Sequence, residues 1–240
     1  MDRPYGCPEH VVLGDFSLFD EFYSMNVRSI SDDLSTLAPG KFLSDKVFGR
    51  LREHLPDDKC FIIDSQFSAL LHSDQMRSDG YTQFDYGTHL LGRSFRKRTG
   101  EPIKILCIVN QGNKGEHWTL LLFDTSDGSC TWFDSCASFL TTDHDFIEGR
   151  FRKAISKAAV QAKWRTWSVL KFGPSLLFQN CPQQKNGFDC GVFVCVFIRY
   201  LVQDKGFLIP DLPTHMTWFR KLFFVELSLN MCYSLFPRLQ

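Results

Sequence analysis

The spacing of apolar residues changes twice along this chain, and this change limits the folds that the chain can adopt. Helical spacing over 42–55 predicts a first helix, with Ser44 and Asp45 as capping side chains near its start. Runs rich in β-branched and aromatic residues then predict strands over 103–109, 119–124 and 130–134. Helical spacing returns over 146–161, 191–202 and 218–233. This order predicts an α+β fold with a central mixed or antiparallel sheet flanked by helices.

Three other segments carry less regular patterns. Residues 61–71 are predicted as a second helix, and residues 166–172 and 176–178 as further strands. Residues 77–100 are polar and contain glycines, which favours a solvated loop. The basic run from Arg93 to Arg98 lies in this segment, and it could instead serve nuclear localisation or bind an acidic partner.

Composition limits the number of domains and the kinds of partner that the chain can bind. The chain has 240 residues, of which 44% are apolar, so it can bury one substantial core. Residues 1–40 show no sustained period and are predicted to form an N-terminal extension on a domain that spans 41–240. Lysine plus arginine equals aspartate plus glutamate at 27 each, and no run of 18 apolar residues occurs. We therefore expect a soluble monomer that binds proteins, with no nucleic acid and no membrane as partner.

The cysteines indicate a reducing compartment. Their number, nine, is odd, and they lie in apolar segments without the close pairs of small secreted domains. We expect them to be reduced, in the cytoplasm or the nucleus. Cys181, Cys190 and Cys195 lack the paired spacing of structural zinc sites, so neither a metal nor another cofactor is expected.

A predicted hairpin places His117 near Asp134. The turn residues 126–128 join the strands 119–124 and 130–134. The start of the first strand lies beside the end of the second, so the histidine before the first strand should approach the aspartate that ends the second. A carboxylate that accepts the proton of one imidazole nitrogen fixes the tautomer, and the other nitrogen can then act as a base.

Cys190 has the surroundings of a nucleophile. It directly precedes the apolar helix 191–202, so it falls at a helix N-terminus, where backbone amides and the helix dipole favour a thiolate. The polar loop 182–187 before it carries Gln184. The side-chain amide of Gln184 and the backbone amide of Cys190 are the candidate donors to the oxyanion of a tetrahedral intermediate.

Each of these residues also has a structural interpretation. His117 could be a buried structural histidine, Asp134 a turn cap and Cys190 a core cysteine. Those interpretations do not account for these three residues and Gln184 all lying at strand ends, in a loop and at a helix start. The combined pattern therefore predicts thiol catalysis, with Cys190 as nucleophile and His117 as base.

Three motifs carry these residues: His117-Trp118-Thr-Leu-Leu-Leu-Phe-Asp124, Trp132-Phe-Asp-Ser135 and Pro182-Gln-Gln-Lys-Asn-Gly-Phe-Asp-Cys-Gly-Val-Phe193. They resemble the ubiquitin-like-protein-specific proteases of the SUMO (sentrin) protease family, including the 17-residue spacing from histidine to aspartate and the six-residue spacing from glutamine to cysteine. The resemblance covers roughly residues 41–233 and is strongest over 103–200. It implies a papain-like, adenovirus-protease-like cysteine peptidase fold with His117, Asp134 and Cys190 as the triad and Gln184 as the oxyanion donor.

The resemblance also implies a substrate tunnel. In that family the tryptophan of a Trp-Leu-Asn-Asp motif and the tryptophan after the catalytic histidine enclose the Gly-Gly tail of the modifier. The first motif looks like Phe42-Leu-Ser-Asp45 here, and the second tryptophan is Trp118. The expected substrate-binding residues are Trp118, Phe42, Asp45 and Gly191. Phe42 and Ser44 depart from the motif, which leaves the identity of the modifier open.

The implied function is that of a thiol peptidase or isopeptidase that removes a ubiquitin-like modifier, with SUMO as first choice, from target proteins after its C-terminal Gly-Gly. It would act in the cytoplasm or nucleus, or in a host cell if the chain is a pathogen effector. Ubiquitin or another modifier is the closest alternative substrate. Acetyltransferase effectors related to this fold generally have glutamate in the acidic position, so Asp134 counts against that activity. The complete triad counts against an inactive modifier-binding module.

Overall fold

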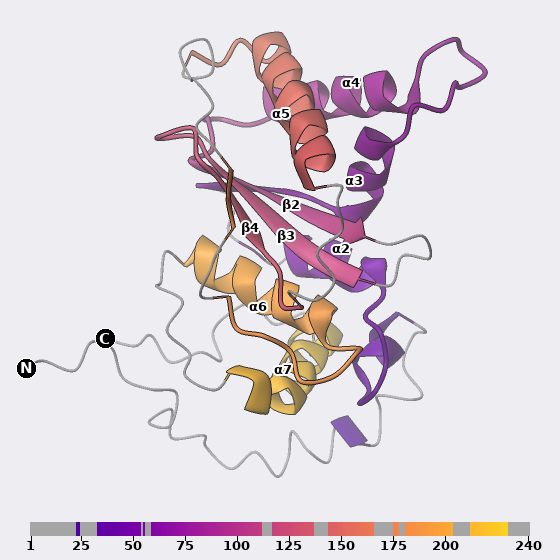
Figure 1. Ribbon diagram of the computed structural model, residues 1–240, viewed down its shortest axis with the longest axis vertical. Coiled ribbons are helices and arrows are strands. Elements are labelled where there is room, and N and C mark those ends of the chain that lie inside the picture. Colours follow the sequence, from indigo (N-terminus) through magenta and orange to yellow (C-terminus); the bar gives the residue numbers. More distant parts are fainter. Residues whose placement is uncertain are drawn as a thin grey trace, which may run out of the picture. The chain divides into compact units, whose positions relative to one another are not determined.

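The computed structural model describes residues 23–24, 33–53, 55, 59–111, 117–136, 144–165, 175–177, 181–203 and 212–229 (Figure 1). These residues form two compact units. Unit 1 comprises the described residues up to Leu55 and those from Pro182 onward, and unit 2 comprises the described residues between Pro56 and Cys181.

Unit 2 contains a mixed five-stranded sheet (Figure 1). Its strands are β1 (Cys60–Ile63), β2 (Lys104–Gln111), β3 (His117–Asp124), β4 (Cys130–Phe133) and β5 (Ser175–Leu177), and they lie in chain order across the sheet. β2, β3 and β4 pair antiparallel, whereas β1 joins β2 and β5 joins β4 in parallel. This arrangement confirms the α+β class and the mixed form of the predicted sheet.

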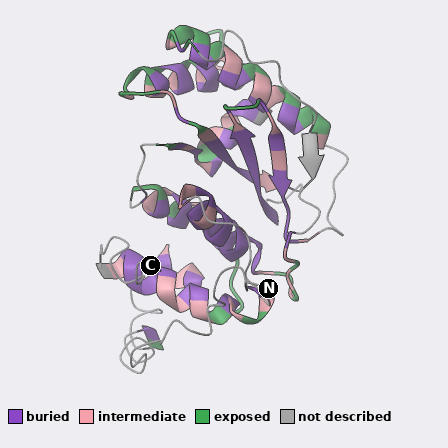
Figure 2. Cartoon of the chain, turned by 90° about the vertical axis from the view of Figure 1, so that its left-hand side faces the viewer, coloured by how far each residue is buried: buried purple, intermediate pink, exposed green. Residues whose placement is uncertain are grey.

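The helices of unit 2 pack on one face of this sheet. They are α3 (Ser65–His72), α4 (Gln83–Arg96) and α5 (His144–Gln161). Alternate strand residues such as Ile105, Cys107 and Val109 form one buried cluster with helix residues such as Phe95 and Phe151, because successive strand side chains point to opposite faces. Strands β1 to β4 are coloured as buried along most of their length, and α4 and α5 each have a buried and an exposed side (Figure 2).

Unit 1 is helical in its described part. It contains η2 (Leu34–Leu37), α2 (Asp45–Glu53), α6 (Cys190–Val202), η5 (Leu212–Thr214) and α7 (Met216–Leu229). Every residue of α6 from Cys190 to Arg199 is buried, as expected for a helix that is apolar on all sides. Near the N-terminus the Tyr23 hydroxyl donates to the Leu37 carbonyl at 2.8 Å.

The prediction of one helix over 61–71 was wrong at its start. Residues Cys60–Ile63 form β1, and the helix begins only at Ser65. Asp64 separates the two elements, because its side chain accepts a hydrogen bond from the Phe67 amide at 2.9 Å and so caps the new helix. Ile62 and Ile63 are β-branched and pair with Leu106 and Cys107, which favours the strand.

The predicted solvated loop over 77–100 was also wrong, since α4 occupies most of it. Thr82 caps this helix by accepting a hydrogen bond from the Asp85 amide at 3.0 Å. Phe84, Leu91 and Phe95 supply its buried stripe. The glycines indicated a loop, but Gly87 and Gly92 allow close packing of α4 instead. A Cβ at Gly87, for example, would lie 3.0 Å from the Leu70 Cβ.

The remaining local predictions agree with the structure wherever its residues are described. The predicted helices over 42–55, 146–161, 191–202 and 218–233 correspond to α2, α5, α6 and α7. The turn over 126–128 joins β3 to β4, and Gly128 has φ +75°, which favours glycine. The segment 176–178 overlaps β5, whereas Phe178, Tyr233 and the predicted strand 166–172 lie outside the described residues.

The close packing at Gly87 leads to a prediction for the stability of the fold. Gly87→Ala should lower the free energy of unfolding by about 1–3 kcal/mol, because the new methyl group is forced against Leu70. Gly149→Ala is the matched control on α5, where a Cβ meets nothing within 4 Å, and it should raise the free energy of unfolding by about 0.5–1 kcal/mol. Urea denaturation of both variants tests the pair. Equal effects of the two substitutions would contradict close packing at Gly87.

Candidate active site

The hairpin of unit 2 holds His117 against Asp134. His117 is the first residue of β3, and Asp134 directly follows β4. The register that pairs Leu120 with Phe133 brings these two ends together. The distance between His117 Nε2 and Asp134 Oδ1 is 2.7 Å, and both side chains are buried. The sequence prediction that the two residues lie close together is confirmed.

The contacts of Asp134 define how the imidazole is oriented. Asp134 Oδ1 also accepts a hydrogen bond from the Cys136 backbone amide at 2.8 Å, which fixes the carboxylate on the loop after β4. A carboxylate so close to Nε2 accepts the proton of that nitrogen. The imidazole can therefore take up a proton at Nδ1, which is the arrangement of a general base with its orienting carboxylate.

Cys190 opens α6 in unit 1, as predicted. It is the first residue of a 13-residue helix and is 1% exposed. At the N-terminus of a helix the first backbone amides have no partner within the helix and carry partial positive charge. Cys190 therefore differs in position from a cysteine in the middle of a core helix, such as Cys195.

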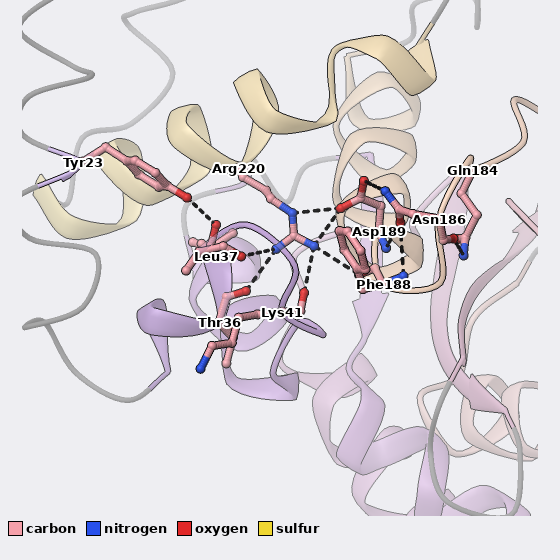
Figure 3. Close-up of polar contacts among 10 residues, drawn as sticks. Tyr23, Thr36, Leu37, Lys41, Gln184, Asn186, Phe188, Asp189 and Arg220 are labelled. Carbon is pink, nitrogen blue, oxygen red and sulfur yellow. Dashed lines mark hydrogen bonds and ion pairs between the residues drawn. The ribbon is translucent and has the colours of Figure 1, made fainter.

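Gln184 belongs to the polar loop that leads into α6. Its side-chain nitrogen donates to the Asn186 carbonyl at 2.6 Å, which ties the amide to the loop (Figure 3). Asn186 in turn donates to Asp189 Oδ2 at 2.7 Å, and its own side-chain oxygen accepts from the amides of Phe188 and Asp189. Gln184 is therefore connected by hydrogen bonds to the residue that precedes Cys190.

The predicted substrate-binding residues divide between the two units. Trp118 lies on β3 of unit 2 and is buried. Phe42 and Asp45 lie in unit 1, where Phe42 is 53% exposed just before α2 and Asp45 begins that helix. Gly191 is the buried second residue of α6.

Arg220, which contacts the residue before Cys190, was not predicted from the sequence. Arg220 lies on α7 and is 2% exposed, and its Nε donates to Asp189 Oδ1 at 2.8 Å (Figure 3). One signal was visible, because an arginine inside the apolar run from Trp218 to Phe224 needs a buried acceptor. The sequence did not indicate which acceptor it would find.

Among the described residues, no group of three or more histidine, cysteine or acidic side chains is placed to hold a metal ion. In the same part of the chain, no helix has both the length and the apolar character needed to span a membrane.

The burial of four other cysteines leads to a prediction for chemical labelling. Burial raises the pKa of the Cys107, Cys130 and Cys195 thiols, and it raises that of Cys181 to about 12. At pH 8 only about one Cys181 thiol in 10⁴ would be ionised, and the thiolate is the form that reacts. We expect iodoacetamide to label these four cysteines far more slowly in the folded chain than in guanidinium, measured by peptide mass spectrometry. Fast labelling of any of the four in the folded chain would contradict their assignment to the core.

Comparisons with known proteins identify a family. Residues 41–230 match the model of the Ulp1 protease family, C-terminal catalytic domain. The curated relatives include a probable sentrin-specific protease 8 of Dictyostelium discoideum, 33% identical over 89 residues, which are 37% of this chain and 33% of that protein. They also include a NEDD8-specific protease 1 of Schizosaccharomyces pombe, 29% identical over 117 residues, which are 49% of this chain and 24% of that protein. The matches thus span a third or less of these two relatives.

The fold is also similar to solved structures. The C-terminal Ulp1 protease domain in complex with Smt3, the yeast ortholog of SUMO, is 19% identical to this chain with a TM-score of 0.68. The similarity covers 89% of this chain and 95% of that domain. The catalytic domain of the Chaetomium thermophilum Ulp1-like SUMO protease gives a TM-score of 0.59 at 18% identity, over 83% of this chain and 76% of that one. These likenesses confirm the predicted cysteine peptidase fold.

Proposed function

Because this chain belongs to the Ulp1 protease family of cysteine peptidases, we propose that it cleaves the bond after the C-terminal Gly-Gly of a ubiquitin-like modifier. The observation that carries this proposal is the buried pair of His117 and Asp134, with 2.7 Å between Nε2 and Oδ1. A histidine held in this way is a general base, and the helix N-terminus at Cys190 supplies a nucleophile of the matching type.

In the proposed reaction His117 takes the Cys190 proton at Nδ1, and the thiolate attacks the carbonyl carbon of the last glycine. The imidazolium then gives this proton to the departing amine, and the C–N bond breaks. A water molecule, deprotonated by the same imidazole, hydrolyses the thioester and releases the modifier as a carboxylate. Asp134 holds the ring in both steps.

Two donors are proposed for the oxyanion, namely the backbone amide of Cys190 and the side-chain amide of Gln184. The hydrogen bond from Gln184 to the Asn186 carbonyl supports this role, because it holds the amide on the loop before the nucleophile. A primary amide has two hydrogens, so the same nitrogen can also donate to a substrate oxygen. Preorganised donors of this kind typically contribute a factor of roughly 10²–10³ to turnover.

Phe42 and Trp118 are proposed to contact the Gly-Gly tail of the modifier. The exposure of Phe42, at 53%, supports this role, since its ring is accessible to such a tail. Aromatic rings that enclose the tail would exclude side chains larger than hydrogen. We therefore expect Phe42→Ala to raise KM and to relax the requirement for glycine, measured with tails that end in Gly-Gly or in Ala-Ala. An unchanged preference for Gly-Gly in this variant would contradict the role.

SUMO is the proposed modifier, and NEDD8 is the second candidate. The motifs around Cys190 resemble the SUMO branch of the family, and the similar Ulp1 domain was solved with Smt3. The Schizosaccharomyces pombe relative, in contrast, is named for NEDD8. The replacement of the family's tryptophan by Phe42 is compatible with either.

The proposal is tested by hydrolysis of SUMO, NEDD8 and ubiquitin that carry a C-terminal coumarin amide. We expect the highest kcat/KM with SUMO and no turnover of any of them by Cys190→Ala. A higher kcat/KM with NEDD8 would replace the first candidate by the second. Turnover that survives in Cys190→Ala would show that another residue is the nucleophile.

A further inference from the structure

Arg220 links two segments of unit 1 through a single buried guanidinium. Its Nε donates to Asp189 Oδ1 at 2.8 Å, and its Nη2 lies 2.7 Å from the same oxygen. Nη1 and Nη2 also donate, at 2.8–3.1 Å, to the backbone carbonyls of Thr36, Ala38, Lys41 and Phe188 (Figure 3). A guanidinium has five N–H groups in a fixed fork, and these acceptors engage all three nitrogens.

Asp189 occupies the N-cap position of α6 without acting as a cap. Its side chain makes no capping hydrogen bond, and its backbone, with φ −92° and ψ −1°, is helical. Elsewhere in the chain, Asp64 and Thr82 are extended at their N-cap positions and accept hydrogen bonds from first-turn amides. The carboxylate of Asp189 is instead held on both oxygens, by Arg220 at Oδ1 and by Asn186 at Oδ2.

This difference matters for the chemistry at Cys190. A carboxylate that capped α6 would accept hydrogen bonds from the amides at the helix start and would place a negative charge beside the thiolate. The amide of Cys190 itself is a proposed oxyanion donor, and its neighbours supply the helix dipole. The oxyanion donor and the helix dipole both depend on where the carboxylate of Asp189 points.

We infer that Arg220 is a positioning residue, which holds the carboxylate of Asp189 away from the N-terminus of α6 and so keeps the amides there for the thiolate and the oxyanion. This inference rests on the proposed role of Cys190 as nucleophile. Through the carbonyl of Lys41, the same guanidinium also fixes the segment that presents Phe42. Arg220 thus acts through Asp189 on the chemical step and through Lys41 on substrate binding.

A second buried arginine provides the matched control. Arg199 of α6 pairs with Glu226 of α7 through two hydrogen bonds of 3.0 and 2.9 Å, and it is as buried as Arg220. It lies about two and a half helical turns beyond Cys190. Removing either arginine deprives a buried carboxylate of its ion-pair partner, but only the loss of Arg220 does so beside Cys190.

The test compares Arg220→Met, Asp189→Ala, the double variant of the two and Arg199→Met in the full chain. Iodoacetamide labelling of Cys190 is followed by peptide mass spectrometry, at a temperature at which circular dichroism shows each variant to be folded. We expect Arg220→Met to slow labelling by about tenfold or more, because the released carboxylate turns to the helix start. Asp189→Ala should slow it less, the double variant should label faster than Arg220→Met, and Arg199→Met should match the wild type.

An ordinary structural ion pair would give a different pattern. Arg220→Met and Asp189→Ala would then slow labelling equally, and the double variant would be no faster than either. That pattern, or a wild-type labelling rate in Arg220→Met, would overturn the inference. If Arg220→Met does not fold, Arg220→Gln takes its place, since its amide fills similar space without the positive charge.

Turnover of the coumarin substrates separates this inference from the proposed function. In Arg220→Met we expect kcat to fall by roughly 10²–10³, the cost of losing an oxyanion donor, and KM to rise. Adding Asp189→Ala should restore part of kcat and leave KM raised. If the wild type cleaves no modifier but the labelling pattern appears, the proposed function fails and the positioning role stands. If the wild type cleaves and the pattern is absent, the positioning role fails alone.

Discussion

Asp134→Asn should lower kcat by roughly 10⁴-fold while the chain remains folded. The carboxylate accepts the Nε2 proton of His117 across 2.7 Å, whereas an amide in the same place can present its NH₂ group to that nitrogen. The imidazole would then carry its proton on Nδ1, which is the wrong tautomer for a base that acts on Cys190. The asparagine has nearly the same shape, so packing around the buried side chain is preserved.

Asp124→Asn is the matched control for this substitution. Asp124 is the last residue of β3, the strand that begins with His117. Its side chain lies at the surface and accepts a hydrogen bond from the Ser126 amide at 2.9 Å. Steady-state kinetics of both variants, with the thermal midpoint recorded for each, measure the effect. A decrease of less than about tenfold in Asp134→Asn, or an equal decrease in Asp124→Asn, would contradict the role of Asp134 in orienting the base.

Glu226→Leu should lower the free energy of unfolding by about 3–5 kcal/mol, the typical cost of breaking a buried ion pair. The two oxygens of Glu226 accept from Arg199 at 2.9 and 3.0 Å, and Arg199 is 3% exposed. Loss of the carboxylate leaves the charge of the guanidinium buried without its counterion. For a chain of this size the change corresponds to a decrease in Tm of about 6–20 °C.

The double variant Arg199→Met with Glu226→Leu separates charge from packing. It removes both charges and fills the same space with apolar atoms, so its stability should be close to that of the wild type. Chemical denaturation of the single and double variants measures this recovery. A double variant as unstable as Glu226→Leu would show that the pair contributes mainly through its shape and its hydrogen bonds.

The sequence predicts those parts of the fold and site that depend on local patterns. Cys190 could be placed at a helix start because the apolar run after it is long and uninterrupted. His117 could be placed beside Asp134 because a short turn determines which strand ends meet. Both predictions need only a few neighbouring residues, and both agree with the structure.

Other parts depend on contacts that a local pattern does not contain. β1 has four residues and lies in an apolar run that also suits a helix, so its pairing with β2 decides its conformation. α4 carries Gly87 and Gly92 because neighbouring helices come close, and glycine in a polar segment otherwise indicates a loop. The contacts of Arg220 join residues 31 to 184 positions apart in the sequence. Only the folded chain brings these groups together.

The most direct test of the central claim, that Cys190 is the nucleophile of a modifier-specific peptidase, is a mass measurement. The purified chain is mixed with SUMO, NEDD8 and ubiquitin that each carry a C-terminal electrophile, and the adduct is located by peptide mapping. The account predicts a covalent adduct on Cys190 with at least one of these modifiers and none with Cys190→Ala. No adduct with any modifier, or an adduct on another cysteine, would contradict it.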